Sequence, residues 1–243
     1  MLDAGDALLR LAGVYTDIGR YRILHGVTFS VRRGRVTALL GRNGAGKTTT
    51  LRTIMGLWRA RQGRIIFDGQ SIAAMETPAI ARLGIAYVPE TMGIFGKLTV
   101  RENMLLATGP HGFKKPALDR VLDRFPALKL KWDSAAGSLS GGQKQMLAIA
   151  RAIIEQRRLL LVDEPTKGLS PAMVDRLVET LLELKREQTT ILLVEQNFRV
   201  AEAVGDDVAV MDEGHITHTG DIAALAADEA LQHRLLGLSM AAA

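Results

Sequence analysis

Apolar runs of strand length alternate with helical periodicity along most of this chain. An apolar stretch and a stretch with β-branched residues flank a predicted turn at residues 16–20, and a glycine-rich loop precedes a helix predicted over 47–57. A second helix is predicted from Pro171 to about residue 184, with Ser170 as its cap and a continuous apolar stripe. Strands are predicted at residues 8–14, 23–31, 36–40, 64–67, 85–88, 159–162, 190–194 and 208–211. This alternation predicts an α/β fold with a mostly parallel sheet covered by helices on both faces.

Strand signals stop between residues 91 and 150. Only helical patches remain there, which predicts a helical lobe inserted into the α/β core. The chain beyond residue 222 is helical again. We therefore expect one domain over 1–243. Its parts would be a core at about 8–90 and 151–225, a lobe at about 91–150 and a tail at about 222–243.

Composition narrows the classes of function. The 243 residues include no cysteine, which excludes disulfides, cysteine-ligated zinc and thiol catalysis. No apolar run approaches the roughly 18 residues that span a bilayer, and we expect no secretory signal at the start. The net charge of +5 comes from scattered basic residues. We expect a solvated basic surface, or one near a membrane, rather than a tract that binds nucleic acid.

The strongest chemical signal is the loop after the strand at 36–40. Gly41-Arg42-Asn43-Gly44-Ala45-Gly46-Lys47-Thr48 matches the G-x-x-x-x-G-K-[ST] pattern and lies between a predicted strand and a predicted helix. The glycines allow several backbone N–H groups to face one anion, and the helix adds its positive N-terminal end. Lys47 would contact the β- and γ-phosphates of a nucleotide, and the Thr48 hydroxyl would bind Mg²⁺.

Two acidic residues end the apolar strand at 159–162. Asp163 would lie at the carboxyl edge of the sheet, where ligands of open parallel sheets bind, and would hold Mg²⁺ directly or through water. Glu164 points elsewhere and would polarise an attacking water. An acidic residue at the end of a strand is common, so this pair indicates a nucleotide site only in combination with Lys47.

A third motif opens an amphipathic helix with the residues Leu139-Ser140-Gly141-Gly142-Gln143. Alone, it would be an ordinary helix cap with a glycine-rich lead. Beside a phosphate loop, it predicts a second phosphate-binding helix end. One nucleotide has no evident need of two such ends from one chain. Two copies of the chain would share them, each helix end facing the other's phosphate loop.

These motifs resemble, in family order and over about residues 8–225, those of the ATP-binding cassette (ABC) ATPases. The resemblance implies a P-loop core, an N-terminal antiparallel β subdomain, the inserted helical lobe, and hydrolysis of ATP with Mg²⁺. The stretches 87–90, 98–103, 145–151 and 193–197 further resemble the ATPase subunits of branched-chain amino-acid importers. The resemblance assigns ATP to Gly41, Arg42, Asn43, Gly44, Ala45, Gly46, Lys47, Thr48 and Thr49 and, acting on the partner's nucleotide, to Ser140, Gly141, Gly142 and Gln143.

Four positions depart from the wider family pattern. Glu90 stands where a glutamine usually meets Mg²⁺ and the membrane partner, and Ser170 stands where aspartate is frequent. Gln196 replaces the usual switch histidine, so it can hydrogen-bond the γ-phosphate but cannot carry a proton charge. All three resemble the habit of the branched-chain subgroup. The aromatic that stacks on adenine is replaced by Ile18, so Tyr21 or Tyr15 would substitute.

The resemblance implies an ATPase subunit attached to the cytoplasmic face of a membrane importer for branched-chain amino acids or a related small solute. Its partners would be permease subunits, a second ABC ATPase subunit in a homo- or heterodimer and, indirectly, a periplasmic solute-binding protein, but no nucleic acid. Its catalytic residues would be Glu164 and Gln196, and its metal ligands Thr48, Glu90 and Asp163.

The rival interpretations within the family are ATPases of urea or amide uptake and of lipid or lipopolysaccharide export. A nucleic-acid-associated ABC protein would need a long heptad insertion or a second cassette, and the sequence has neither. The motif at 139–143 argues against a small-molecule kinase with a phosphate loop.

Overall fold

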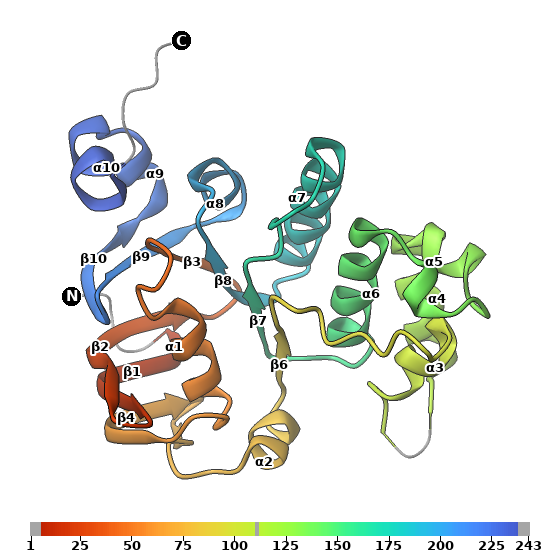
Figure 1. Cartoon of the computed structure of the whole chain (residues 1–243), viewed down its shortest axis with the longest axis horizontal. Helices are drawn as coiled ribbons and strands as arrows, with labels where there is room; N and C mark the ends of the chain where they lie inside the picture. The colour runs from red at the N-terminus through yellow and green to blue at the C-terminus, as the bar shows by residue number, and fades with distance from the viewer. Residues whose placement is uncertain (1–5, 110–111, 238–243) are drawn as a thin grey trace.

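The computed structural model describes residues 6–109 and 112–237, which form two sheets and a helical lobe (Figure 1). The strands of the first sheet are β1 (Ala7–Ile18), β2 (Tyr21–Arg32), β4 (Ala60–Phe67) and β5 (Gln70–Ser71). They pair antiparallel in the order β2-β1-β4-β5. The predicted α/β class is confirmed, including the N-terminal antiparallel part.

The second sheet has six strands in the order β10-β9-β3-β8-β7-β6. They are β3 (Val36–Leu40), β6 (Ile85–Val88), β7 (Leu159–Asp163), β8 (Thr190–Glu195), β9 (Asp207–Asp212) and β10 (His215–Asp221). All pair parallel except β10, which returns antiparallel to β9. Successive residues of β7 alternate between two cores, because the strand is covered on both faces.

Helices cover both faces of this sheet. On one side α1 (Lys47–Ile54) is buried between the two sheets, and its Leu51 and Ile54 share a core with residues of both. On the other side lie α6 (Gly141–Ile153) and α7 (Pro171–Arg186). The face formed by β3 and β9 is covered by α8 (Phe198–Val204) and α9 (Ile222–Ala226), followed by α10 (Glu229–Leu236).

The helical lobe lies beyond α6, on the right in Figure 1. Its members are α3 (Val100–Leu105), α4 (Lys115–Arg124), α5 (Pro126–Leu130) and the 3-10 turn η1 (Ala136–Ser138). Met104, Val121 and Leu128 pack in the same core as Leu147 of α6. The helix α6 therefore joins the lobe to the sheet. A short helix, α2 (Thr77–Arg82), precedes β6.

Local expectations were wrong at two places in the first sheet. The turn expected at 16–20 is narrower, because β1 continues to Ile18 and Thr16 is buried, with its hydroxyl 3.1 Å from that of Thr53. The strand expected at 64–67 begins at Ala60, which pairs with Thr16. Ser170 occupies the position before α7, but its side chain makes no capping hydrogen bond. Within the described ranges, no helix combines the length and apolar character needed to span a bilayer.

The carboxyl ends of the five parallel strands meet at one edge of the sheet. The register sets Leu40 of β3 beside Glu195 of β8, and Asp163 of β7 beside Val194. The loops that leave these strands therefore converge, as expected for the ligand-binding edge of an open parallel sheet.

Candidate active site

The loop between β3 and α1 is shaped by glycines with positive φ. Gly41, Gly44 and Gly46 have φ values of 152°, 82° and 108°. A Cβ at Gly41 would lie 2.2 Å from the carbonyl oxygen of Met211, so only glycine fits there. The loop enters α1 at Lys47, which directs the N-terminus of that helix toward the strand ends.

The Lys47 ammonium lies inside this loop, with 4% of the residue's surface exposed. It donates to the carbonyl oxygens of Gly41 at 2.8 Å and Arg42 at 3.0 Å. It also lies 3.3 Å from Oε1 of Glu164. The predicted phosphate-binding cation and the predicted catalytic carboxylate are thus direct neighbours.

Asp163 lies at the end of β7 with both oxygens held by hydroxyl groups. Thr48 Oγ1 donates to Oδ1 at 3.0 Å, and Tyr87 Oη donates to Oδ2 at 3.0 Å. Burial raises the pKa of Asp163, and the hydrogen bonds from Tyr87 and Thr48 oppose that rise. Burial is also the main cause that raises the pKa of the Tyr87 hydroxyl, and the nearby Asp163 charge raises it further.

The donors around Asp163 suit Mg²⁺. A carboxylate oxygen and a threonine hydroxyl are hard oxygen ligands, and Mg²⁺ usually takes one or two protein carboxylates beside phosphates and water. The third predicted ligand, Glu90, follows β6 and is near enough to Asp163 to contribute to the rise of its pKa. Asp163 and Thr48 therefore fit the predicted ion, and the described residues form no cluster of three or more acidic or histidine side chains that would hold a metal without other ligands.

Lys167 lies near the carboxylates of both Glu90 and Glu164. Lys167 Nζ lies 2.6 Å from Glu90 Oε1 and 3.8 Å from Glu164 Oε2, and the hydrogen bond to Glu90 raises the pKa of Lys167. Glu164 itself has a φ of 44°, a conformation rare for a side chain of this size. Its backbone N–H donates to the carbonyl oxygen of Val194 at 2.9 Å, which fixes this turn to β8.

Gln196 reaches the phosphate loop from the end of β8. Its Nε2 donates to Oδ1 of Asn43 at 2.6 Å. A cavity of about 210 Å³ is lined by Asn43, Gly44, Gly46, Lys47, Thr48, Thr49, Glu90, Glu164 and Lys167, together with Ile23. Most of the residues predicted from the loop and the strand ends therefore share one cavity.

The residues considered for adenine lie elsewhere. Of the described residues, Ile23 rather than Ile18 or Tyr21 lines the cavity. Ile18 pairs with Tyr21 at the hairpin end, and Tyr21 is 70% exposed. Tyr15 sets its ring against Gly26 and beneath the guanidinium of Arg22.

The motif at 139–143 is also away from the cavity. Ser140 caps α6, accepting from the Gln143 N–H at 3.3 Å, while Gln143 Oε1 accepts from the Ser140 N–H at 3.0 Å. Gly142 packs on Met173 of α7, where a Cβ would lie 2.4 Å from the methionine methyl. None of these residues lines the cavity of about 210 Å³ in the described chain. This chain does not bring its own α6 end to its own phosphate loop.

Tyr87, Lys167 and Glu195 belong to the site but were not among the predicted residues. Glu195 is an acid at the end of an apolar strand, as Asp163 is, so that signal was present in the sequence. The contributions of Tyr87 and Lys167 depend on which strands are neighbours, and no local pattern carries that information.

A phosphate loop, an acidic strand end and an open parallel sheet define the class of nucleotide-hydrolysing proteins with a P-loop. A family profile described as ABC transporter matches residues 24–167. The chain belongs to this family, and it is an ATP-binding, ATP-hydrolysing protein. The resemblance drawn from the motifs, the enzyme class and the nucleotide are thereby confirmed.

Relatives match along nearly the whole chain. A high-affinity branched-chain amino acid transport ATP-binding protein, BraG of Pseudomonas aeruginosa, is 37% identical over 95% of this chain and 100% of its own length. A probable branched-chain amino acid transport ATP-binding protein, LivF of Archaeoglobus fulgidus, is 35% identical, with 93% and 95% covered. Ribose and methionine import proteins of Chromobacterium violaceum and Rhizobium johnstonii are 32% and 33% identical, and the chain covers 46% and 62% of them.

Solved structures agree with the fold. The ADP conformation of an ATP-binding cassette of an ABC transporter superposes with a TM-score of 0.81 at 27% identity, covering 96% of this chain and 99% of the other.

Proposed function

We propose that this chain is the ATPase subunit of an importer for branched-chain amino acids or a related small solute. The observation that carries the proposal is the match to BraG and LivF, at 37% and 35% identity and over 100% and 95% of their lengths. Import proteins named for ribose and methionine match at lower identity and over about half to two thirds of their lengths. The chain would attach to the cytoplasmic face of the membrane through permease subunits, with a periplasmic solute-binding protein supplying the solute.

The site residues would divide the work of hydrolysis. The loop from Gly41 to Thr49 would hold the phosphates through backbone N–H groups and the Lys47 ammonium. Thr48, Asp163 and Glu90 would hold Mg²⁺, which when bound offsets negative charge on the phosphate oxygens. Glu164 would polarise the attacking water, and Gln196 would donate a hydrogen bond to the γ-phosphate.

A second cassette would complete the site. The capped N-terminus of α6 presents Ser140 and Gly141 to solvent, and both residues are exposed. In a dimer this helix end would face the phosphate loop of the partner, where its positive end would favour the γ-phosphate. Binding and release of ATP would then close and open the pair, which drives the permease between its states.

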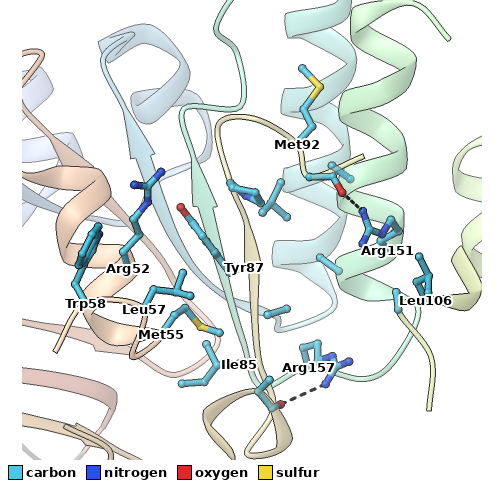
Figure 2. Close-up of a pocket in the computed structure, with 18 residues that line it drawn as sticks. Arg52, Met55, Leu57, Trp58, Ile85, Tyr87, Met92, Leu106, Arg151 and Arg157 are labelled. Atoms are coloured by element: carbon cyan, nitrogen blue, oxygen red, sulfur yellow. Dashed lines mark hydrogen bonds between the residues drawn. The ribbon is translucent and has the colours of Figure 1, made fainter. Parts of the chain in front are cut away.

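The permease would dock in a groove between the core and the lobe (Figure 2). This groove of about 780 Å³ has exposed Leu57 and Trp58 on one side and exposed Leu106 on the other. Arg151 lines it, and the buried Nε of that residue has no hydrogen-bond partner within the described chain. An apolar permease segment would cover the exposed side chains of Leu57, Trp58 and Leu106.

Tyr87 connects the groove to the nucleotide site. The Tyr87 ring lines the groove, next to Arg52 in Figure 2, while its hydroxyl donates to Asp163. A segment seated in the groove would therefore act on a residue that touches the proposed metal ligand.

Uptake by cells that lack the gene tests the transported solute. We expect loss of labelled leucine, isoleucine and valine uptake, retained urea uptake, and recovery with the wild-type gene but not with Lys47→Ala. Normal uptake of the three amino acids, with loss of another solute, would contradict the proposal.

A further inference from the structure

Glu195 is a buried carboxylate to which no role has been assigned above. It ends β8 with 2% of its surface exposed. Burial raises its pKa, and hydrogen bonds from Thr166, Asn197 and Gln196 oppose the rise. A buried carboxylate is costly unless its oxygens are satisfied by donors. The groups that donate hydrogen bonds to Glu195 therefore indicate its role.

The two oxygens of Glu195 hold two different loops. Oε1 accepts from Oγ1 of Thr166 at 2.7 Å and from its backbone N–H at 3.2 Å, in the loop that follows Glu164. Oε2 accepts from the backbone N–H groups of Gln196 at 3.1 Å and Asn197 at 3.4 Å. One side chain thus ties the loop after β7 to the loop after β8.

The connection extends to the phosphate loop. The side chain of Gln196 donates to Asn43 at 2.6 Å, while its backbone is held by Glu195. Thr166, Glu195, Gln196 and Asn43 therefore form one chain of hydrogen bonds across three loops. Its central member is a buried carboxyl group that accepts from four donors in two loops.

We propose that Glu195 is a positioning residue that keeps Gln196 in register with the loop of Glu164. The inference rests on the proposed roles of Gln196 and Glu164 at the γ-phosphate. Only a carboxylate offers acceptors to both loops. In Glu195→Gln the amide nitrogen must face a backbone N–H group of one loop or the other, so the backbone hydrogen bonds to that loop are lost.

Kinetics and nucleotide binding together test this role. In Glu195→Gln we expect kcat to fall about tenfold, while KM and the calorimetric MgATP affinity stay within about twofold of wild type. Gln196→Ala should lower kcat in the wild-type background. In the Glu195→Gln background the same substitution should lower kcat by less than about twofold, because the Gln196 side chain is already misplaced there.

Two further variants keep the test decisive. Thr166→Val removes one hydrogen bond to Oε1 at nearly constant shape, and its kcat should lie between those of wild type and Glu195→Gln. Asp207→Asn is the matched control, because it changes a buried carboxylate on β9 that pairs with Arg32 and Arg35. It should lower stability and leave kcat unchanged.

Wild-type kcat in folded Glu195→Gln or, where that variant does not fold, in Thr166→Val, would overturn the inference. So would an equal cost of Gln196→Ala in both backgrounds. Wild-type kcat in the single variant Gln196→Ala is a separate outcome. It would contradict the proposed contact of Gln196 with the γ-phosphate, and the inference about Glu195 would fail with that contact.

Discussion

At the scale of single residues, the site is a set of charges that hold one another in place. Lys47 lies against Glu164, Lys167 bridges Glu164 and Glu90, and Asp163 is held by two hydroxyl groups. Buried charges persist in proteins when such partners surround them. Incoming phosphates would therefore meet donors that are already arranged, which limits the reorganisation needed on binding.

Lys47→Ala tests the phosphate loop. The substitution removes the ammonium that the structure sets inside the loop, and we expect MgATP binding at least about tenfold weaker with the fold retained. Isothermal calorimetry measures the affinity. Lys129→Ala, at an exposed position of α5, is the control and should bind normally. Equal affinities of Lys47→Ala and wild type would contradict the assignment.

Tyr87→Phe tests the proposed metal side of the site. The ring stays in place, but Oδ2 of Asp163 loses its donor, so the carboxylate is less firmly oriented. We expect MgATP affinity about three- to tenfold lower and an unchanged affinity for ATP in the presence of a chelator. A drop of equal size with and without Mg²⁺ would show that Tyr87 acts on packing alone.

Sequence patterns were informative for residues whose roles are local. The spacing of Gly41, Gly46 and Lys47 specifies a loop shape by itself, and the structure has that loop. Tyr87 and Lys167 act only because β6 and β7 are neighbours. Their chemistry depends on strand order, which the sequence pattern does not specify.

At the scale of elements, the segments with a clear hydrophobic pattern were predictable, and the shortest helical segments were not. The helix α7 begins at Pro171 as expected, and β3 and β6 have the expected limits. The helix α5 and the turn η1, with five and three residues, are too short for a periodic pattern and went unpredicted. The early end expected for β1 was wrong because the polar Thr16 is satisfied inside the fold by Thr53.

Ser140→Ala tests the cap of α6. Both hydrogen bonds of the capping box depend on the geometry of this residue, so we expect a loss of about 1 kcal/mol in the free energy of unfolding. Urea unfolding measures it. Ser140→Thr keeps the hydroxyl and should recover most of the loss. An unchanged unfolding free energy in Ser140→Ala would mean that the cap contributes nothing to stability.

At the scale of the whole molecule, the groove runs along β6, and the nucleotide cavity includes Glu90, just beyond the end of this strand. Residues at the end of this strand contribute to both, and α6 connects the lobe to the sheet beside them. Movement of the lobe relative to the core would thus reach the groove and the α6 N-terminus together. This arrangement suits a protein that converts ATP binding into work on a membrane partner.

The central claim is that the ATP site at this phosphate loop is completed by the N-terminus of α6 from a second cassette. The direct measurement is the light-scattering mass of Glu164→Gln, which should bind ATP without hydrolysing it. We expect one chain of 26.4 kDa without nucleotide and twice that mass with MgATP. Adding Ser140→Arg should keep the mass at one chain while MgATP still binds. A mass of one chain in Glu164→Gln saturated with MgATP would contradict a site shared between two copies.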